Sequence, residues 1–240
     1  MSGDDHRTLA PVARMPRGTV WRSASDRDGA GPRRPSRRTA RHRRDGKLQA
    51  VNPVPIHAHN PGPITGDGNW TWLLPGRVPT LIDAGTGDPR HLQAVHEALG
   101  LASVAQVLVT HGHGDHASGA PALAEHFAAA RFLKMPWPER DGKWSVAWHP
   151  IADGDRIDAG NTALIAIHTP GHSPDHVCFW HPETGTLFCG DLAIRGTTVW
   201  IPTHLQGDLA AYLASLDRVL ELNPARMMPA HGPVIDQPAS

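Results

Sequence analysis

The sequence predicts a fold of the α/β class, in which strands and helices alternate along the chain. Between residues 80 and 130, short apolar and β-branched runs are separated by stretches with apolar residues at helical spacing, which is the alternation typical of this class. The chain has 240 residues, enough for one domain with a substantial core and a tail. In addition, several predicted strands are followed directly by motifs that contain His or Asp.

The composition changes near residue 48. Residues 1–47 hold 13 Lys and Arg against 5 Asp, whereas residues 48–240 hold 10 basic against 18 acidic residues, so the net charge of zero combines a basic tail with an acidic body. The tail is rich in Arg, Pro, Gly and Ser, and such a segment buries too little apolar surface to offset its ordering entropy. We therefore expect residues 1–47 to be a disordered tail and residues 48–240 to form the folded domain.

Three interpretations of the tail remain open: a nucleic-acid-binding arm, an Arg-rich transit peptide, and an upstream extension without a role, which we favour. The acidic body does not resemble a broad nucleic-acid-binding surface. The sequence has no apolar run of about eighteen residues and no signal-peptide pattern, so we expect a cytoplasmic protein that does not span a membrane. Cys178 and Cys189 belong to no paired motif and are expected to be core thiols in a reducing compartment.

The elements of the first half are predicted from periodicity and from breaker residues. Apolar and β-branched runs predict strands, and Gly100 is the stop signal of the first helix. The predicted strands are Trp70–Leu74, Thr80–Ile82 and Val104–Thr110, and the predicted helices are Asp88–Leu99 and Ala120–Ala130.

The second half begins with a less regular stretch, Phe132 to His149, which contains three tryptophans. These either line a substrate cleft or cap the edge of the core. An amphipathic helix follows later, with Asp208 as its N-cap and six apolar residues on one face. The tryptophans are Trp137, Trp144 and Trp148; the predicted strands are Ile151–Ile157, Ala163–Ile167, Val177–Trp180, Thr186–Cys189 and Arg226–Pro229; and the helix is Asp208–Leu222 with Leu209, Tyr212, Leu213, Leu216, Val219 and Leu220.

The stretch VLVTHGHGDHASG, Val107 to Gly119, is the most informative part of the chain. Its apolar start predicts the end of a buried strand, and the two glycines that follow predict a turn. Four side chains of metal-ligand type, His111, His113, Asp115 and His116, project from that turn. Alternation directs the first three roughly one way, so the adjacent His116 can face a different metal ion.

Imidazole nitrogen and carboxylate oxygen suit zinc and related first-row ions, and the absence of Cys argues against a closed structural site. A single loop histidine is most often only solvated. Four potential ligands within six residues favour a metal site instead.

The HGHGDH sequence resembles the HxHxDH signature of the metallo-β-lactamase superfamily. Motifs in the order that this family shows follow other predicted strands, at Asp83, at His172 in HTPGHSPDH, at Asp191 in CGD and at His231 in AHG. The resemblance implies a four-layer αββα sandwich with the metal site at one edge of its two sheets.

The resemblance also implies a set of ligands. The first metal ion takes His111, His113 and His172, and the second takes Asp115, His116 and His231. Asp191 lies between the two ions, since its two oxygens can bridge a pair 3.5 to 4 Å apart.

Three further residues near the motifs, Asp83, His176 and His168, have expected roles other than metal binding. The resemblance implies that Asp83 braces the metal-binding loop rather than ligating metal. His176 is a candidate for contact with a ligand or with substrate. We expect His168 only to make a hydrogen bond at the end of its strand.

The resemblance implies two Zn²⁺ per chain, with Fe or Mn possible, and a hydrolase in which a metal-bridging hydroxide attacks an ester or thioester carbonyl. Bound zinc lowers the pKa of water from 15.7 to about 7. Asp115 is expected to orient the hydroxide and to carry its proton to the leaving group.

Within the family, the sequence is most similar to the β-lactamase-like protein two subgroup, on NPGPITGDG, GTTVW and the PAHGPVI ending. This keeps a single-strand-specific endoribonuclease as an alternative, and a mononuclear iron persulfide dioxygenase as another. The expected partner is a small-molecule or acyl-carrier substrate, with RNA possible and the oligomeric state open. A non-enzymatic binding module that uses the Arg-rich tail is a third class; deletion of the tail would abolish its activity and spare that of a hydrolase.

Overall fold

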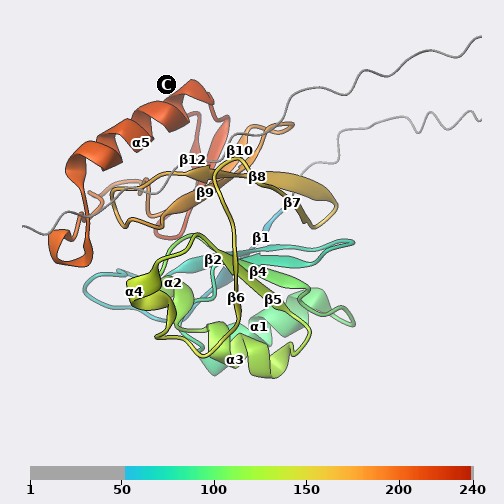
Figure 1. Cartoon of the computed structure of the whole chain (residues 1–240). Helices are drawn as coiled ribbons and strands as arrows, with labels where there is room; N and C mark the ends of the chain where they lie inside the picture. Colours follow the sequence, from blue (N-terminus) through green and yellow to red (C-terminus); the bar gives the residue numbers. More distant parts are fainter. Residues whose placement is uncertain (1–51, 239–240) are drawn as a thin grey trace, which may run out of the picture. The chain divides into compact units, whose positions relative to one another are not determined.

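The computed structural model describes residues 52–238. Two six-stranded sheets lie face to face, with helices on their outer faces (Figure 1). This arrangement confirms the predicted α/β class and the helix, sheet, sheet, helix layering. The disorder expected for residues 1–47 concerns a segment outside the described residues.

The first sheet has the order β1-β2-β3-β4-β5-β6. Its first two pairings, β1 with β2 and β2 with β3, are antiparallel, and the others are parallel. The strands are β1 (Val54–His57), β2 (Trp70–Leu74), β3 (Thr80–Ile82), β4 (Gln106–Val109), β5 (Arg131–Lys134) and β6 (Trp148–Pro150).

The second sheet has the order β12-β11-β10-β9-β8-β7. It is antiparallel except for the parallel pair β10 and β11, whose register shifts between Phe188 and Gly190. The strands are β7 (Arg156–Ala159), β8 (Thr162–His168), β9 (Val177–His181), β10 (Thr186–Gly190), β11 (Arg226–Pro229) and β12 (Ile235–Asp236).

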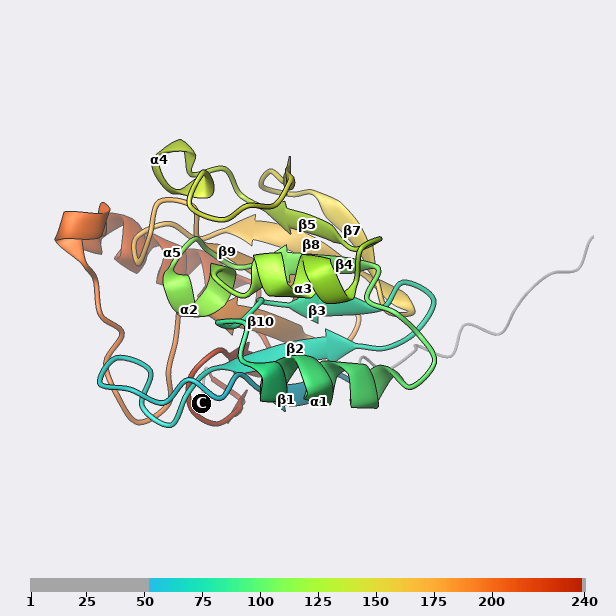
Figure 2. The same cartoon turned by 90° about the horizontal axis from the view of Figure 1, so that it is seen from below.

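The helices cover the outer faces of the sheets. Figure 2 shows α1 and α3 across the first sheet, and Figure 1 shows α5 along the outer face of the second. None of the helices within residues 52–238 has the length and apolar character needed to cross a membrane. The helices are α1 (Pro89–Leu99), α2 (Gly114–Ala117), α3 (Ala120–His126), α4 (Pro138–Asp141) and α5 (Leu209–Glu221), with a 3₁₀ turn at Thr203–Leu205.

Alternation along the strands produces three core layers. In β4, Val107 and Val109 pack towards α1 and α3, whereas Leu108 lies in the cluster between the two sheets. A third cluster lies between the second sheet and α5 and contains Cys178 and Cys189, which are buried and unpaired. The prediction of two core thiols is thus confirmed, and β4 is buried on both faces, as its continuous apolar run predicted.

The sequence prediction missed or misplaced several strands. β1, β5, β6 and β12 were not predicted, and the strand expected at Ile151–Ile157 is wrong. Asp153 and Gly154 turn the chain there, with Gly154 at a φ of 81°, so the strand β7 starts only at Arg156. Apolar residues at alternate positions on both sides of this turn give the same sequence pattern as one longer strand, which is why the prediction was wrong.

One prediction about apolar side chains also needs correction. Of the six apolar residues predicted on one face of α5, only Tyr212, Leu216 and Val219 pack on the sheet, while Leu209, Leu213 and Leu220 are more than half exposed. At about 100° per residue, the three exposed leucines lie roughly 60–100° around the helix axis from Tyr212, on one flank of α5, so they point past the sheet.

Of the three tryptophans of residues 132–149, Trp144 and Trp148 lie at the edge of the core, whereas Trp137 lies beside the His113 ring, with 6.0 Å between the ring centroids. Trp144 and Trp148 pack against the cluster under the first sheet, and Trp137 is buried. The cleft described below is lined by other tryptophans.

A buried histidine between α1 and the first sheet should make stability depend on pH. His91 is fully buried; its Nε2 lies 2.8 Å from Thr71 Oγ1, and burial lowers its pKa from 6.5 to about 4. As the pH falls, the His91 imidazole is protonated in the unfolded chain before it is protonated in the folded one. The contribution of neutral His91 to the free energy of unfolding is therefore full above pH 6.5 and is lost as the pH falls towards 4. At pH 5 the expected loss is about 2 kcal/mol relative to pH 7.5.

Urea unfolding of the wild type and of His91→Gln at both pH values measures this contribution. Gln can keep a hydrogen bond to Thr71 but does not titrate, so the variant should lose less stability on acidification. Equal losses in the two proteins would contradict the assignment.

Candidate metal centre

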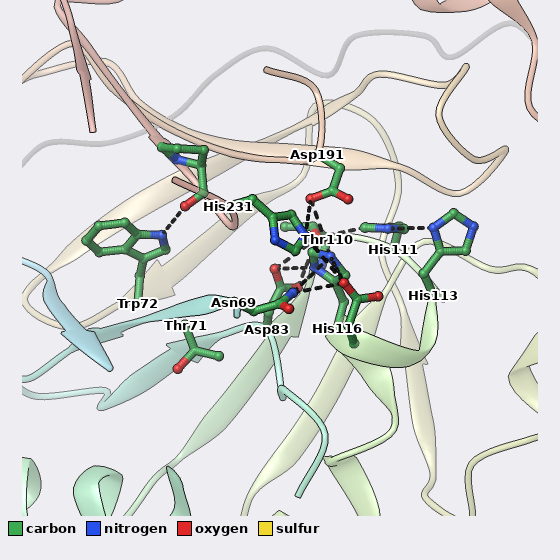
Figure 3. Close-up of polar contacts among 12 residues, drawn as sticks. Asn69, Thr71, Trp72, Asp83, Thr110, His111, His113, His116, Asp191 and His231 are labelled. Carbon is green, nitrogen blue, oxygen red and sulfur yellow. Dashed lines mark hydrogen bonds and ion pairs between the residues drawn. The ribbon is translucent and has the colours of Figure 1, made fainter. Parts of the chain in front are cut away.

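The seven side chains predicted as ligands gather at one edge of the sandwich. Figure 3 labels five of them, His111, His113, His116, Asp191 and His231. Four of them follow β4 in the first sheet, and the other three follow β8, β10 and β11 in the second. Strand ends can meet there because the sheets face each other and these strands stop at the same edge. The site is therefore assembled from both halves of the chain.

The first group consists of three histidines. His111 Nε2 and His113 Nδ1 lie 3.0 Å apart, and His172 Nε2 is 2.9 Å from His113 Nδ1 and 3.2 Å from His111 Nε2. Tetrahedral zinc with Zn–N bonds of 2.0–2.1 Å would set its ligand nitrogens about 3.3 Å apart. The three nitrogens thus have nearly the spacing that a shared metal ion requires.

The second group combines a carboxylate with two histidines. Asp115 Oδ2 lies 3.4 Å from His116 Nε2 and 3.3 Å from His231 Nε2. Strand alternation predicted that Asp115 would face the same way as His111, and this is wrong. Gly114–Ala117 forms a short helix, α2, and its winding turns Asp115 towards His116.

Asp191 lies between the two groups. One carboxylate oxygen, Oδ2, is 3.4 Å from His172 Nε2, while the other, Oδ1, is 3.4 Å from both His116 Nε2 and His231 Nε2. Each oxygen therefore faces a different group. This is the geometry expected of a carboxylate that bridges two cations.

An unpaired buried atom supports the fit to metal ions. Asp191 Oδ1 is buried without a hydrogen-bond partner within residues 52–238. Burying a charged oxygen without a partner is costly, and a cation at this position would remove that penalty for Asp191. The donor set of imidazole and carboxylate, without thiolate, suits an open site for zinc, iron or manganese.

The electrostatics differ between the two groups. Burial lowers the pKa of His113 to about 3 and lowers that of His111 well below 6.5, so these rings are neutral. In the second group burial opposes charge, yet the carboxylates of Asp115 and Asp191, 3.3 and 3.4 Å from His231 Nε2, raise the pKa of His231 to about 9. The carboxylate-rich group thus attracts positive charge, which a metal ion would supply in place of protons.

Asp83 contacts the metal-binding loop from beneath. Its Oδ1 accepts a hydrogen bond from the backbone N–H of Thr110 (2.7 Å), and its Oδ2 accepts one from His116 Nδ1 (2.9 Å). His116 therefore presents Nε2 to the site. Asp83 has a φ of 64°, which aspartate tolerates better than most residues, and it lies outside the two groups, as the bracing role requires.

His176 lies behind the ligands rather than at the surface. It is fully buried, its Nε2 accepts a hydrogen bond from the backbone N–H of Asp191 (3.1 Å), and its Nδ1 lies 2.8 Å from Thr169 Oγ1. Because His176 is fully buried, it cannot contact a substrate. Its candidate role is to hold the backbone of Asp191. His168, as expected, donates a hydrogen bond from Nε2 to Pro174 O.

Three groups at the site were missed by the sequence analysis. Asn69 donates a hydrogen bond to Asp115, the carbonyl of Trp200 accepts one from His172 Nδ1 (2.7 Å), and Lys134 pairs with Asp175 behind the loop. Asn69 could have been noticed as a polar residue between a Gly-rich turn and a strand. A backbone carbonyl such as that of Trp200 leaves no signal in the sequence.

A cavity of about 1020 Å³ opens beside the site. His172, Asp191 and His231 form part of its wall, and the rest comes largely from apolar and aromatic side chains of three loops and strands. Trp200, which is half exposed, and Ile64 stand at opposite loops of this wall. A substrate in the cavity would therefore reach the three candidate ligands that follow strands of the second sheet.

The chain was compared with known proteins. Residues 63–231 match the family model described as "Metallo-beta-lactamase superfamily". The "Beta-lactamase-like protein 2 homolog" of Caenorhabditis elegans is 34% identical over 190 residues, and the "Lactamase-like protein vrtG" of Penicillium aethiopicum is 36% identical over 191 residues. These matches cover 76% and 75% of this chain but only 62% and 56% of the two relatives.

Among solved structures, the protein TTHA1623 in a di-iron-bound form is 32% identical to this chain, with a TM-score of 0.64. The match covers 78% of this chain and 96% of that one. The similarity therefore extends over nearly the whole of a protein with the same layered architecture.

Proposed function

Because the chain belongs to the metallo-β-lactamase superfamily, we propose that it is a hydrolase that uses two metal ions to cleave an ester or thioester. Each of the two groups of side chains would hold one ion, with Asp191 between the groups. The chain covers little more than half the length of the curated relatives named above, so the proposal concerns this domain.

The observation that carries the proposal is the position of Asp191. Its two oxygens face different groups, at 3.4 Å from His172 on one side and 3.4 Å from His116 and His231 on the other. A mononuclear iron dioxygenase needs only one group of ligands. The second, carboxylate-containing group supports two ions over that alternative.

Metal ions held at these positions would supply a hydroxide at neutral pH and would polarise the carbonyl of the substrate. The protein contributes the geometry. Asp83 fixes the ring of His116, and the carbonyl of Trp200 fixes that of His172. The carboxylate of Asp115 is about one-fifth exposed, so it can pass a proton to a leaving group in the cavity.

The cavity favours an acyl substrate over RNA. Its wall includes Trp70, Trp72, Val199 and Trp200, and Arg195 is the one Arg or Lys on it within the described part of the chain. Grooves for single-stranded nucleic acid combine stacking aromatics with several cations along the backbone path. This wall has the aromatics without the row of cations, which supports an apolar acyl group.

The experiment combines metal analysis with a substrate screen on the full chain purified without chelator. We expect two equivalents of metal and turnover of thioesters or esters with apolar acyl groups, lost on chelation and restored by Zn²⁺. If the purified protein contained two equivalents of iron or manganese, the identity of the metal would change but the proposed hydrolytic function would stand. One iron per chain, or cleavage of single-stranded RNA without ester turnover, would contradict the proposal.

A further inference from the structure

The segment before β2 lies between the cavity and the second group of ligands, Asp115, His116 and His231. We propose that Asn69, at the end of this segment, is a positioning residue that sets the orientation of Asp115 and thereby the metal affinity of that group. The inference rests on the proposed two-metal function. It assigns a role to a residue outside the HGHGDH, GHSPDH, GD and AHG motifs.

Asn69 contacts the second group directly. It is 1% exposed, and its Nδ2 lies 3.1 Å from Asp115 Oδ2 and 3.3 Å from His116 Nε2 (Figure 3). The oxygen that it contacts is the one that faces His116 and His231. A buried amide at this distance restricts the rotation of the carboxylate.

The hydrogen bonds of Asn60 determine which end of the Asn69 amide faces Asp115. The backbone N–H of Asn69 donates to the side chain of Asn60 (2.9 Å), and this acceptor must be Oδ1. Asn60 therefore presents its Nδ2, a donor, to Asn69 Oδ1 at 2.7 Å. With its oxygen engaged in this way, Asn69 must present Nδ2 to Asp115, so the orientation follows from the network.

The same segment also holds the turn that carries His231. The backbone N–H of Trp70 donates to the carbonyl of Ala230 (2.7 Å), and Trp72 Nε1 donates to that of Pro229 (3.1 Å). The side chain of Asn69 thus contacts two members of the second group, Asp115 and His116. Trp70 and Trp72 hold the backbone just before the third member, His231.

Asn69 also closes the loop that lines the cavity. Residues 63–68 form part of the cavity wall, and the paired amides of Asn60 and Asn69 join the two ends of this loop. Gly68 has a φ of 113°, and a Cβ there would lie 3.1 Å from Asn60 Oδ1. The loop therefore requires glycine next to Asn69, and a substrate that moves the loop would act on Asp115 through this amide.

The test measures metal affinity, which does not depend on turnover. The full chain is treated with chelator and titrated with Zn²⁺ in competition with a chromophoric chelator. In Asn69→Ala, one of the two zinc sites should weaken by about 10- to 100-fold, the usual effect of removing a hydrogen bond to a metal ligand. The other site should keep its affinity.

Two further variants complete the design. Asn60→Ala frees the Asn69 amide to rotate and should weaken the same site by a smaller factor; it also carries the test if Asn69→Ala does not fold. Thr71→Val is the control, because Thr71 is equally buried on the adjoining strand β2 but contacts His91 and the carbonyl of Ile56 instead of the site. Both zinc sites of Thr71→Val should match the wild type.

The outcomes separate the two proposals. Two wild-type zinc sites that Asn69→Ala and Asn60→Ala leave unchanged would overturn the positioning role alone. A wild-type protein that binds fewer than two metal ions in separate titrations with Zn²⁺, Fe²⁺ and Mn²⁺ would overturn the two-metal function and this inference with it. Equal weakening in Thr71→Val would also overturn the positioning role, because it would show that general loss of packing is sufficient.

Discussion

Replacing Asp115 by Asn should lower kcat by about 10²- to 10⁴-fold, the range expected for loss of a group that transfers a proton. Asn has the same shape and can still accept the hydrogen bond that Asn69 donates to Asp115 Oδ2. It cannot take up and release a proton, and it brings no negative charge to His116 and His231. The variant should therefore fold normally and turn over substrate poorly.

The measurement is kcat at saturating metal, together with the midpoint of urea unfolding. Saturation matters because loss of the carboxylate charge also weakens metal binding. Asp217→Asn, an identical change on the exposed side of α5, should leave both quantities unaltered. If Asp115→Asn lost stability in proportion to turnover, Asp115 would have a structural role and the assignment as proton carrier would be wrong.

Replacing Lys134 by Met should destabilise the domain by about 3–5 kcal/mol, the usual effect of removing one partner of a buried ion pair. Lys134 Nζ is 1% exposed, lies 3.1 Å from Asp175 Oδ2 and donates hydrogen bonds to Asp141 and to the carbonyl of Met135. Burial already raises the pKa of Asp175, which Lys134 opposes. Without Lys134, Asp175 is left as an uncompensated buried acid.

Urea unfolding of a double-mutant cycle checks this prediction. Asp175→Asn removes the charge but can keep the hydrogen bond from Ser173, so the double variant Lys134→Met with Asp175→Asn should be more stable than the sum of the single losses predicts. Lys143→Met, at an exposed position nearby, should change stability by less than about 0.5 kcal/mol. A loss below about 1 kcal/mol in Lys134→Met would contradict the prediction.

The ligand groups could be predicted because each motif follows a strand whose apolar run is visible in the sequence. His111 follows β4, and Asp191 follows β10; a glycine beside each marks the turn. Strands without such a run were missed. β1 contains Pro55, and β6 is only Trp148–Pro150, so neither shows alternation long enough to recognise.

The contacts that hold the ligands could not be predicted in the same way. The amide of Asn69 and the carboxylate of Asp115 are 46 positions apart, and Lys134 meets Asp175 only because β5 lies beside β4 and the loop after β8. Such pairs depend on the order of strands in the sheet, which local patterns do not specify. The turn of Asp115 towards His116 also depended on one short helix, α2.

Both groups of ligands draw on the two sheets: His172 joins two residues that follow β4, and His231 joins two others. A metal ion in either position would join the two halves of the chain in addition to the apolar packing between them and contacts such as Trp70 to Ala230 and Lys134 to Asp175. Folding would then be linked to the free concentration of that ion, by about 2.7 kcal/mol for an ion at one hundred times its dissociation constant. The cations proposed for hydrolysis would therefore also stabilise the fold, and the metal-free protein should be cleaved more readily by proteases.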